Sequence, residues 1–216
     1  MSRPRSPKGR ARETNVRLAV EYPGDAVALC ALDHRNPFEL LTATILSAQT
    51  TDERVNMVTP ALFARYPTPE DLAGADPDEL EELIRSTGFY RNKTRSLLGM
   101  AEALVTRFDG EVPSAMADLV TVPGVGRKTA NVVRSVALGL PGLPVDTHVG
   151  RLARLLGLTT ETDPVKVEHE LNAMLPAADR GVFSLRVILH GRAVCIARRP
   201  RCLDCVLNDF CPSSSV

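Results

Sequence analysis

Four of the five cysteines lie within 17 residues near the end of the 216-residue chain, and together they could ligate a metal centre. Their spacing is Cys195-x6-Cys202-x2-Cys205-x5-Cys211. Four thiolates around one centre suit either zinc or an iron–sulfur cluster. Zinc sites made of four cysteines usually contain two Cys-x2-Cys pairs, whereas here single cysteines flank one pair at unequal spacing. The pattern therefore favours a cluster, whose iron corners each need one thiolate, with zinc and then no metal as the alternatives.

Three arginines, Arg198, Arg199 and Arg201, lie between the first two of these cysteines. A loop held at both ends by metal ligands would fix their charges in space. We therefore expect them to contact the phosphate backbone of a nucleic acid. The alternative is a solvated loop whose charge only offsets that of the cluster.

A second pattern that could do chemistry is the glycine-containing segment Pro123–Lys128, which reads PGVGRK. We expect a short helix from Ser114 to Val122, a turn, and a second helix from about Arg127 to Leu138. The glycines let backbone N–H groups converge, and the new helix adds its own, so the segment can hold a phosphate without reading a base. The pattern predicts a helix-hairpin-helix unit that contacts DNA through Gly124, Val125, Gly126 and Arg127.

Lys128 has two possible roles in this hairpin. It could be a further phosphate contact, or its amine could be a nucleophile that forms a Schiff base. A free lysine is neutral in only about one molecule in 2,500 at pH 7. The first turn of a helix disfavours the ammonium, and burial in a cleft would favour the neutral amine further.

Asp146 follows eighteen residues later, in the segment Pro144–Val149. We predict that it caps a helix over Thr147–Leu156, and a cap can still direct its second oxygen into a cleft. We assign the neighbouring His148 to packing or to a backbone hydrogen bond.

The elements that must position these residues are all expected to be helices. Apolar residues recur at helical spacing, and helix starts are marked where Thr68, Asp76 and Asp163 precede a proline. The sequence shows neither sustained two-residue alternation nor a β-hairpin signal. We predict an all-α fold of about ten helices of roughly 8 to 18 residues.

The charge balance limits how the chain could bind nucleic acid. Lys plus Arg and Asp plus Glu both number 26, which excludes a strongly basic wrapper of DNA. Aromatic residues make up 4% and Trp is absent, which disfavours a single-strand binder based on stacking. There is no membrane-length apolar run or secretory signal. Residues 1–12, with five basic and no acidic side chains, are expected to be a flexible tail that attracts DNA only loosely.

Together these motifs resemble the bacterial endonuclease III family of DNA glycosylase/AP lyases, over about residues 16 to 212. The resemblance also includes further segments, which are Leu46–Asp52, Thr87–Tyr90 and Leu189–Arg192. It implies two domains with a cleft between them. Residues 30–140 would form a six-helix barrel, and residues 13–29 with 141–216 would hold a [4Fe-4S] cluster on the four cysteines.

The resemblance also implies the activity and the role of each site residue. The family removes oxidised pyrimidines from double-stranded DNA and cleaves the abasic site by β-elimination. Lys128 matches its nucleophile and Asp146 its catalytic carboxylate. Gln49 matches the side chain that fills the gap left by the flipped nucleotide, and we expect Thr50 beside it to contact DNA. We expect a monomeric, cytoplasmic, nucleoid-associated bacterial protein with no membrane partner.

Two other functions remain as alternatives. An adenine-removing glycosylase of the same superfamily shares the cluster, but it typically lacks the lysine and carries an additional C-terminal domain. A non-catalytic DNA-binding module would use the hairpin and the cluster loop only as clamps. Formation of a covalent adduct between Lys128 and abasic DNA separates these alternatives from a lyase.

Overall fold

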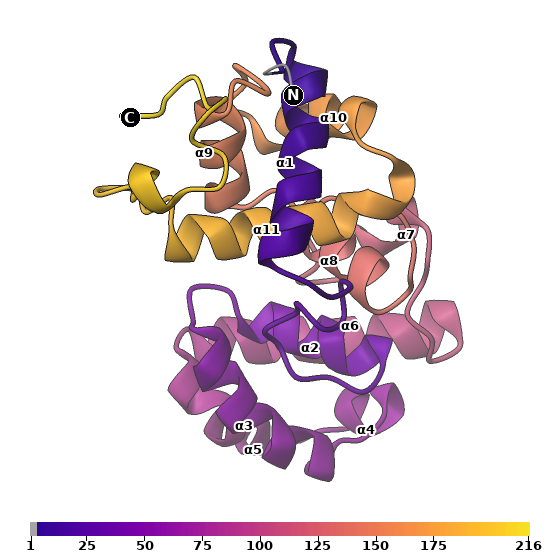
Figure 1. Cartoon of the computed structure of the whole chain (residues 1–216). Helices are drawn as coiled ribbons and strands as arrows, with labels where there is room; N and C mark the ends of the chain where they lie inside the picture. The colour runs from indigo at the N-terminus through magenta and orange to yellow at the C-terminus, as the bar shows by residue number, and fades with distance from the viewer. Residues whose placement is uncertain (1–3) are drawn as a thin grey trace. The chain divides into compact units, whose positions relative to one another are not determined.

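The computed structural model describes residues 4–216, and over these residues the protein is all-α, as the sequence predicts (Figure 1). They form eleven α-helices and three 3-10 helices, with no strand. The predicted length of roughly 8 to 18 residues is wrong for two short helices, α4 (Pro69–Ala73) and α7 (Met116–Leu119). No helix in the described part of the chain is long and apolar enough to cross a membrane. The chain divides into two compact units, Cys30–Gly139 and Leu140–Val216 with the residues up to Leu29.

The Cys30–Gly139 unit is built around α2 (Pro37–Leu46), in which every residue from Phe38 to Leu46 is buried. This helix contacts α3 (Asp52–Arg65), α6 (Tyr90–Phe108) and α8 (Arg127–Val136). The helices α4 and α5 (Pro77–Ile84) pack against α6, and the 3-10 helix η1 (Arg85–Thr87) follows α5. The six helices expected of this region are thus seven α-helices, of which α4 and α7 are little more than one turn.

The predicted helix starts are confirmed by their capping contacts. The Thr68 hydroxyl accepts from the Asp71 amide while the Asp71 carboxylate accepts from the Thr68 amide. The Asp76 carboxylate caps α5, and that of Asp163 caps α10 (Pro164–Met174). In each case the proline occupies the first turn, where its missing N–H leaves no hydrogen bond unmade.

The second unit is a bundle of four helices. It contains α1 (Pro7–Glu21), α9 (Thr147–Leu155), α10 and α11 (Arg180–Ala193), with 3-10 helices η2 (Ala177–Asp179) and η3 (Cys202–Asp204). The helix α11 contacts α1 and α9, and α10 contacts the same two helices. Leu207 and Phe210 carry the C-terminal segment into the same apolar core. The four-cysteine segment is therefore anchored to the bundle by apolar burial.

The prediction of a flexible tail over residues 1–12 is wrong for residues 7–12, which are helical. Residues 1–3 lie outside the described residues, but α1 begins at Pro7, where the Ser6 hydroxyl accepts from the Gly9 amide. The Arg10 guanidinium donates to the carbonyl oxygens of Leu156 at 2.7 Å and Gly157 at 2.5 Å. These are the orphan carbonyls at the end of α9, which a cation stabilises. The Arg10 side chain thus anchors α1 to the end of α9, which lies 146 positions further along the chain.

Candidate functional site

The glycine-containing segment forms the predicted hairpin, with boundaries shorter than expected. The first helix is α7 (Met116–Leu119) instead of Ser114–Val122, and the second is α8, which ends at Val136 instead of Leu138. Val122 and Val125 on either side of the turn are buried, and the Val125 amide donates to the Val122 carbonyl at 3.1 Å. The two valines fix the turn on the core of the Cys30–Gly139 unit while Pro123, Gly124 and Gly126 stay exposed.

Gly124 is the position in the hairpin that requires glycine. Its φ is +79°, in the left-handed region that other residues rarely adopt. A Cβ added there would lie 2.8 Å from the Cβ of Ser96 on α6, which is closer than two such atoms approach. The turn therefore lies directly against α6, and this contact fixes its backbone conformation.

The N-terminus of α8 offers backbone donors at the exposed end of the hairpin. Gly126 is its N-cap residue and has no side chain to cap the helix. The first turn of a helix has N–H groups without intrahelical acceptors, and these attract anions. Lys128 is exposed in this first turn. The partial burial that would favour its neutral amine is therefore not found.

The loop with Gln49 and Thr50 joins α2 to α3. Gln49 is exposed and has a φ of +56°, one of three non-glycine residues with positive φ among the described residues. Thr50 is half-buried, and its hydroxyl donates to the Thr87 carbonyl. Thr51 closes the loop by capping α3 through the Arg54 amide at 3.2 Å.

Asp146 is the N-cap of α9, as predicted. Its Oδ1 accepts a hydrogen bond of 2.8 Å from the Val149 amide, and the side chain is half-buried. Its Oδ2 takes no part in the cap. His148 packs against Gly191, where an added Cβ would lie 2.9 Å from the imidazole Nδ1, which agrees with the packing role expected for it.

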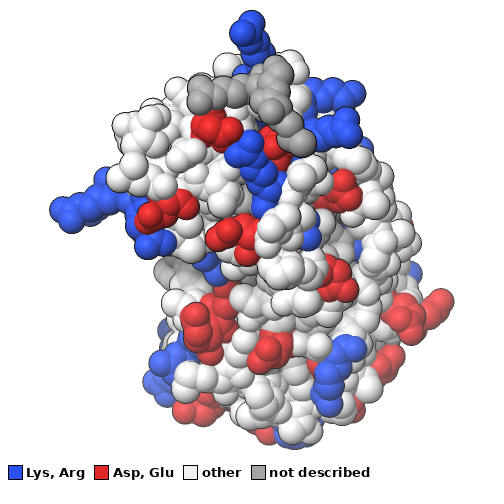
Figure 2. Space-filling model, in the orientation of Figure 1, with Lys and Arg blue, Asp and Glu red and all other residues white. Residues whose placement is uncertain are grey.

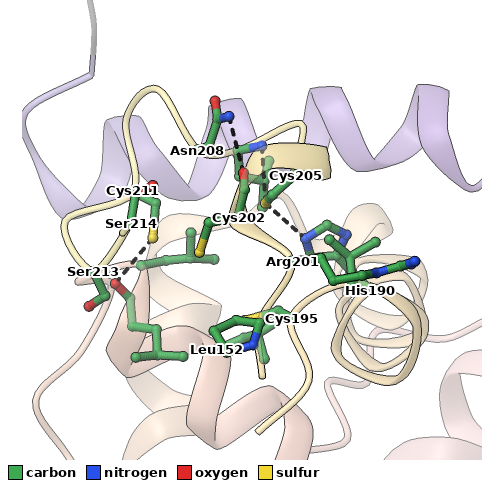
Figure 3. A pocket seen from close by; sticks show the side chains of 15 residues that line it. Leu152, His190, Cys195, Arg201, Cys202, Cys205, Asn208, Cys211, Ser213 and Ser214 are labelled. Carbon is green, nitrogen blue, oxygen red and sulfur yellow. Dashed lines mark hydrogen bonds between the residues drawn. The ribbon is translucent and has the colours of Figure 1, made fainter. Parts of the chain in front are cut away.

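The four C-terminal cysteines come together around one space in the helical bundle. Cys195, Cys202, Cys205 and Cys211 are all free thiols and line a single cavity of about 80 Å³ (Figure 3). This volume is several times the roughly 10–15 Å³ of accessible space that one water molecule needs. The donor set is entirely sulfur, which suits iron–sulfur clusters. The residues present thus fit a cluster with four thiolate ligands.

Neighbouring side chains lie within hydrogen-bonding distance of two of these sulfurs. The His190 Nε2 lies 3.3 Å from the Cys205 Sγ, and the Arg151 Nη1 lies 3.7 Å from the Cys195 Sγ. Burial lowers the pKa of His190 to about 4, and the Tyr22 hydroxyl lies 3.3 Å from its Nδ1. A neutral imidazole carries one ring proton, so His190 donates either to the Tyr22 oxygen or to the Cys205 sulfur, according to its tautomer. Such contacts orient and tune metal ligands.

The three arginines of the cysteine segment are exposed, but they are not equivalent. Arg201 Nη2 donates to the Ala193 carbonyl at 2.6 Å, and its Nε lies 3.9 Å from the Asp204 carboxylate. Arg201 is therefore partly engaged by the protein itself. On the face drawn in Figure 2, Lys and Arg side chains are interspersed with Asp and Glu.

The structure thus assembles three groups of the predicted residues, which are the hairpin, the α2–α3 loop and the four cysteines. Sequence reasoning missed several side chains that support them. Arg151 and His190 gave no local signal, because their roles depend on contacts with residues up to 44 positions away. Lys93 is in helical phase with Leu97, Met100 and Leu104, all of them buried. That phase could have shown it to be buried.

Comparisons with known proteins cover almost the whole chain. A family model described as "HhH-GPD superfamily base excision DNA repair protein" matches residues 42–177. A second, described as "Iron-sulfur binding domain of endonuclease III", matches residues 195–211. An endonuclease III from Synechocystis is 54% identical over 97% of this chain and 94% of its own length.

Solved structures agree with the sequence relatives. A non-covalent endonuclease III–DNA complex superposes with a TM-score of 0.88 at 42% identity, covering 95% of each chain. A trapped endonuclease III–DNA covalent intermediate gives the same TM-score and identity and covers 95% of this chain and 96% of the other. The helical architecture is thus shared with these proteins, and the two family models cover the hairpin and the cysteine segment.

Proposed function

This chain belongs to the endonuclease III family of base-excision DNA repair enzymes, and we propose that Lys128 is its nucleophile and Asp146 its catalytic carboxylate. It is a DNA glycosylase and AP lyase that acts on double-stranded DNA and carries a [4Fe-4S] cluster. The substrates we propose are oxidised pyrimidines and the abasic sites that they leave. The position of Lys128 in the first turn of α8, directly after the phosphate-binding turn, is the observation that carries the assignment.

A comparison with the environments of the other lysines supports the assignment of Lys128 as the nucleophile. The sequence has only four, and the remaining three are Lys8, Lys93 and Lys166. Lys93 is 4% exposed, and its ammonium is enclosed by protein acceptors. Lys166 lies 3.6 Å from the Glu161 carboxylate. Lys8 and Lys166 are also exposed, but the side chains of Ser6 and Asp163 cap the helices on which they lie, whereas the amides of α8 beside Lys128 have no side-chain cap.

The proposed reaction begins when the damaged nucleotide leaves the helical stack. The Lys128 amine attacks C1′, and the base departs with the electron pair of the glycosidic bond and takes up a proton. Asp146 stabilises the positive charge that develops on the sugar and helps to deprotonate the amine. The sugar ring then opens to a protonated imine between C1′ and Nζ. Loss of a C2′ proton expels the 3′ phosphate, which breaks the strand by β-elimination.

Three groups are proposed to hold the DNA during this reaction. The amides at Gly124–Arg127 bind a backbone phosphate, and the turn conformation fixed by Gly124 places them in advance. Gln49 fills the gap left by the flipped nucleotide, with Thr50 beside it in contact with the DNA. Arg198 and Arg199 provide a further phosphate contact, while Arg201 contributes less because it is already bonded to the Ala193 carbonyl.

The proposed domains are a barrel over residues 30–140 and a cluster domain of residues 13–29 with 141–216. The two compact units support this division, since their boundaries fall between residues 29 and 30 and between 139 and 140. The four cysteines lie in the second unit together with α1, α9, α10 and α11. We further propose that the protein is a monomer of the bacterial cytoplasm, associated with the nucleoid, where its DNA substrate lies.

Borohydride trapping tests the nucleophile directly. Borohydride reduces an imine to a stable amine, so wild-type protein mixed with abasic-site duplex should give a covalent adduct. Digestion and mass spectrometry should then place the modification on Lys128. An adduct on Lys8, Lys93 or Lys166, or no adduct at all, would contradict the assignment.

A pair of variants separates the two roles of Asp146. Asparagine caps helices about as well as aspartate, so Asp146→Asn should change stability little while base release slows by roughly 10² to 10³-fold. Asp146→Ala should show the same loss of activity and, in addition, lose about 1 kcal/mol of unfolding free energy because the cap is removed. Single-turnover base release and urea unfolding measure the two effects. An active Asp146→Asn protein would reduce Asp146 to a helix cap.

A further inference from the structure

Lys93 is a buried cation that the proposed reaction does not use. Its side chain lies on the inner face of α6 and is 4% exposed. The ammonium donates three hydrogen bonds of 2.8 Å each, to the carbonyl oxygens of Leu46 and Thr87 and to the Thr50 hydroxyl. All three of its N–H groups are therefore satisfied, and every acceptor is a neutral oxygen.

The three acceptors belong to segments that are far apart in the sequence. Leu46 is the last residue of α2, where helix carbonyls lack intrahelical partners and attract a cation. Thr50 lies in the loop to α3, and Thr87 ends the 3-10 helix before α6. The Thr50 hydroxyl, which accepts from Lys93, donates in turn to the Thr87 carbonyl. One ammonium thus links the end of α2, the loop after it and the end of the 3-10 helix η1 in a single hydrogen-bonded group.

The backbone is strained at two positions beside this group, one in the loop after α2 and one directly before α6. Gln49 has a φ of +56° and Phe89 a φ of +47°, and both side chains are exposed. They account for two of the three non-glycine residues with positive φ among residues 4–216. A left-handed conformation of such residues costs on the order of 1 kcal/mol and persists only where the surroundings hold it. The Lys93 group lies one residue from Gln49 and two from Phe89 along the chain.

Stability alone gives a weak reason for an ammonium at this position. Burial lowers the pKa of Lys93, because the charged ammonium loses its hydration. Its three hydrogen-bond acceptors are neutral oxygens, and none of them is a carboxylate that would compensate for this loss. Methionine, of similar length, would fill the space without this penalty, although the Leu46 carbonyl would lose its Lys93 donor. What methionine cannot do is to hold three oxygen atoms of separate segments in one fixed arrangement.

We propose that Lys93 is a positioning residue that locks the Gln49 loop onto the Thr87–Phe89 segment, so that Gln49 is held in its DNA-filling conformation before DNA arrives. The inference rests on the proposed role of Gln49. A preorganised loop does not lose further conformational freedom when it binds, and therefore the lock increases affinity for DNA with a flipped nucleotide. Lys93 itself touches no reacting atom.

A double-mutant cycle with Gln49 tests the proposal on the full-length, cluster-containing protein. Lys93→Met should reduce the single-turnover cleavage of abasic duplex at limiting enzyme by about tenfold, equivalent to one charge-assisted hydrogen bond. Thr50→Val removes part of the same group and should show a smaller loss. Adding Lys93→Met to Gln49→Ala should cause little further loss, because residues that act through one another are not additive. At saturating enzyme, borohydride trapping on Lys128 should persist.

The control and the second readout make the outcomes distinct. Lys166→Met removes an exposed lysine from α10 and should match wild type. Hydrogen exchange of the amides at residues 47–51 should be faster in Lys93→Met than in wild type. This measurement does not depend on the enzyme being active. Unchanged exchange, or an equal loss of cleavage with and without Gln49→Ala, would overturn the positioning role. If wild type itself forms no adduct, the proposed chemistry fails, and exchange alone still decides whether Lys93 locks the loop.

Discussion

Replacing Lys128 with alanine is expected to abolish the borohydride adduct and to slow cleavage at abasic sites by on the order of 10⁴-fold. The variant loses the only amine in the first turn of α8, and without an imine the C2′ proton is not acidic enough for rapid elimination. Affinity for abasic duplex should fall much less, because the backbone amides of the hairpin remain. Single-turnover cleavage and fluorescence anisotropy separate the two effects.

The matched control for this prediction is Lys166→Ala. It removes a lysine that lies beside Glu161 on the surface of α10, so cleavage and trapping should equal those of wild type. Both variants should unfold at nearly the wild-type temperature, since the two side chains are exposed. A Lys128→Ala protein that still forms the adduct would mean that another amine is the nucleophile.

Replacing Cys205 with alanine is expected to have the largest effect on stability. Cys205 packs against the core of the helical bundle, and Leu207 and Phe210 follow it into the same core. Without its ligand the cluster is lost, and the segment from Cys195 to Cys211 no longer has a covalent link across its own loop. Iron should fall from about four atoms per chain to near zero. Loss of the burial of Leu207 and Phe210 should lower Tm by about 10 °C.

Cys30→Ala provides the control for the cluster. Cys30 is the fifth cysteine, it begins the other compact unit, and its Sγ lies 3.7 Å from the Leu32 carbonyl. The variant should keep its iron and its yellow-brown colour. Iron that stays at about four atoms per chain in Cys205→Ala would remove Cys205 from the ligand set. A colourless wild type with a single zinc ion would overturn the cluster itself.

Several features could be predicted from the sequence because short segments decide them. The caps at Thr68, Asp76, Asp146 and Asp163 each depend on one side chain and the next three amides. The hairpin depends on two glycines and two buried valines within five residues. The first helix was predicted to end three residues too late, at Val122 instead of Leu119, where the turn that the valines fix takes over. Its start and the end of α8 were each predicted two residues too far out, which is the usual uncertainty of helix ends.

Other features depend on partners that are distant in the chain. The α1 helix starts five residues before the predicted end of the tail, at the local Ser6 cap, and Arg10 then holds this first part of the helix against the end of α9. Arg91 and Arg95 lie near Lys93 in the sequence and are both exposed. The helical phase that Lys93 shares with buried apolar residues of α6 indicates burial, but only the packing of α6 against α2 shows which oxygen atoms enclose the ammonium.

The sequence by itself determined the helical class, the four thiols, the phosphate-binding hairpin and the residues Lys128 and Asp146 as candidates for catalysis. These follow from residue types at short spacing, where local geometry and side-chain chemistry leave few alternatives. Only the tertiary structure decided that the thiols line one cavity, that His190 lies within hydrogen-bonding distance of one of them, and that a buried ammonium ties the Gln49 loop to the Thr87 segment. Such contacts join residues from 6 to 47 positions apart, and their energies depend on burial that no local pattern specifies.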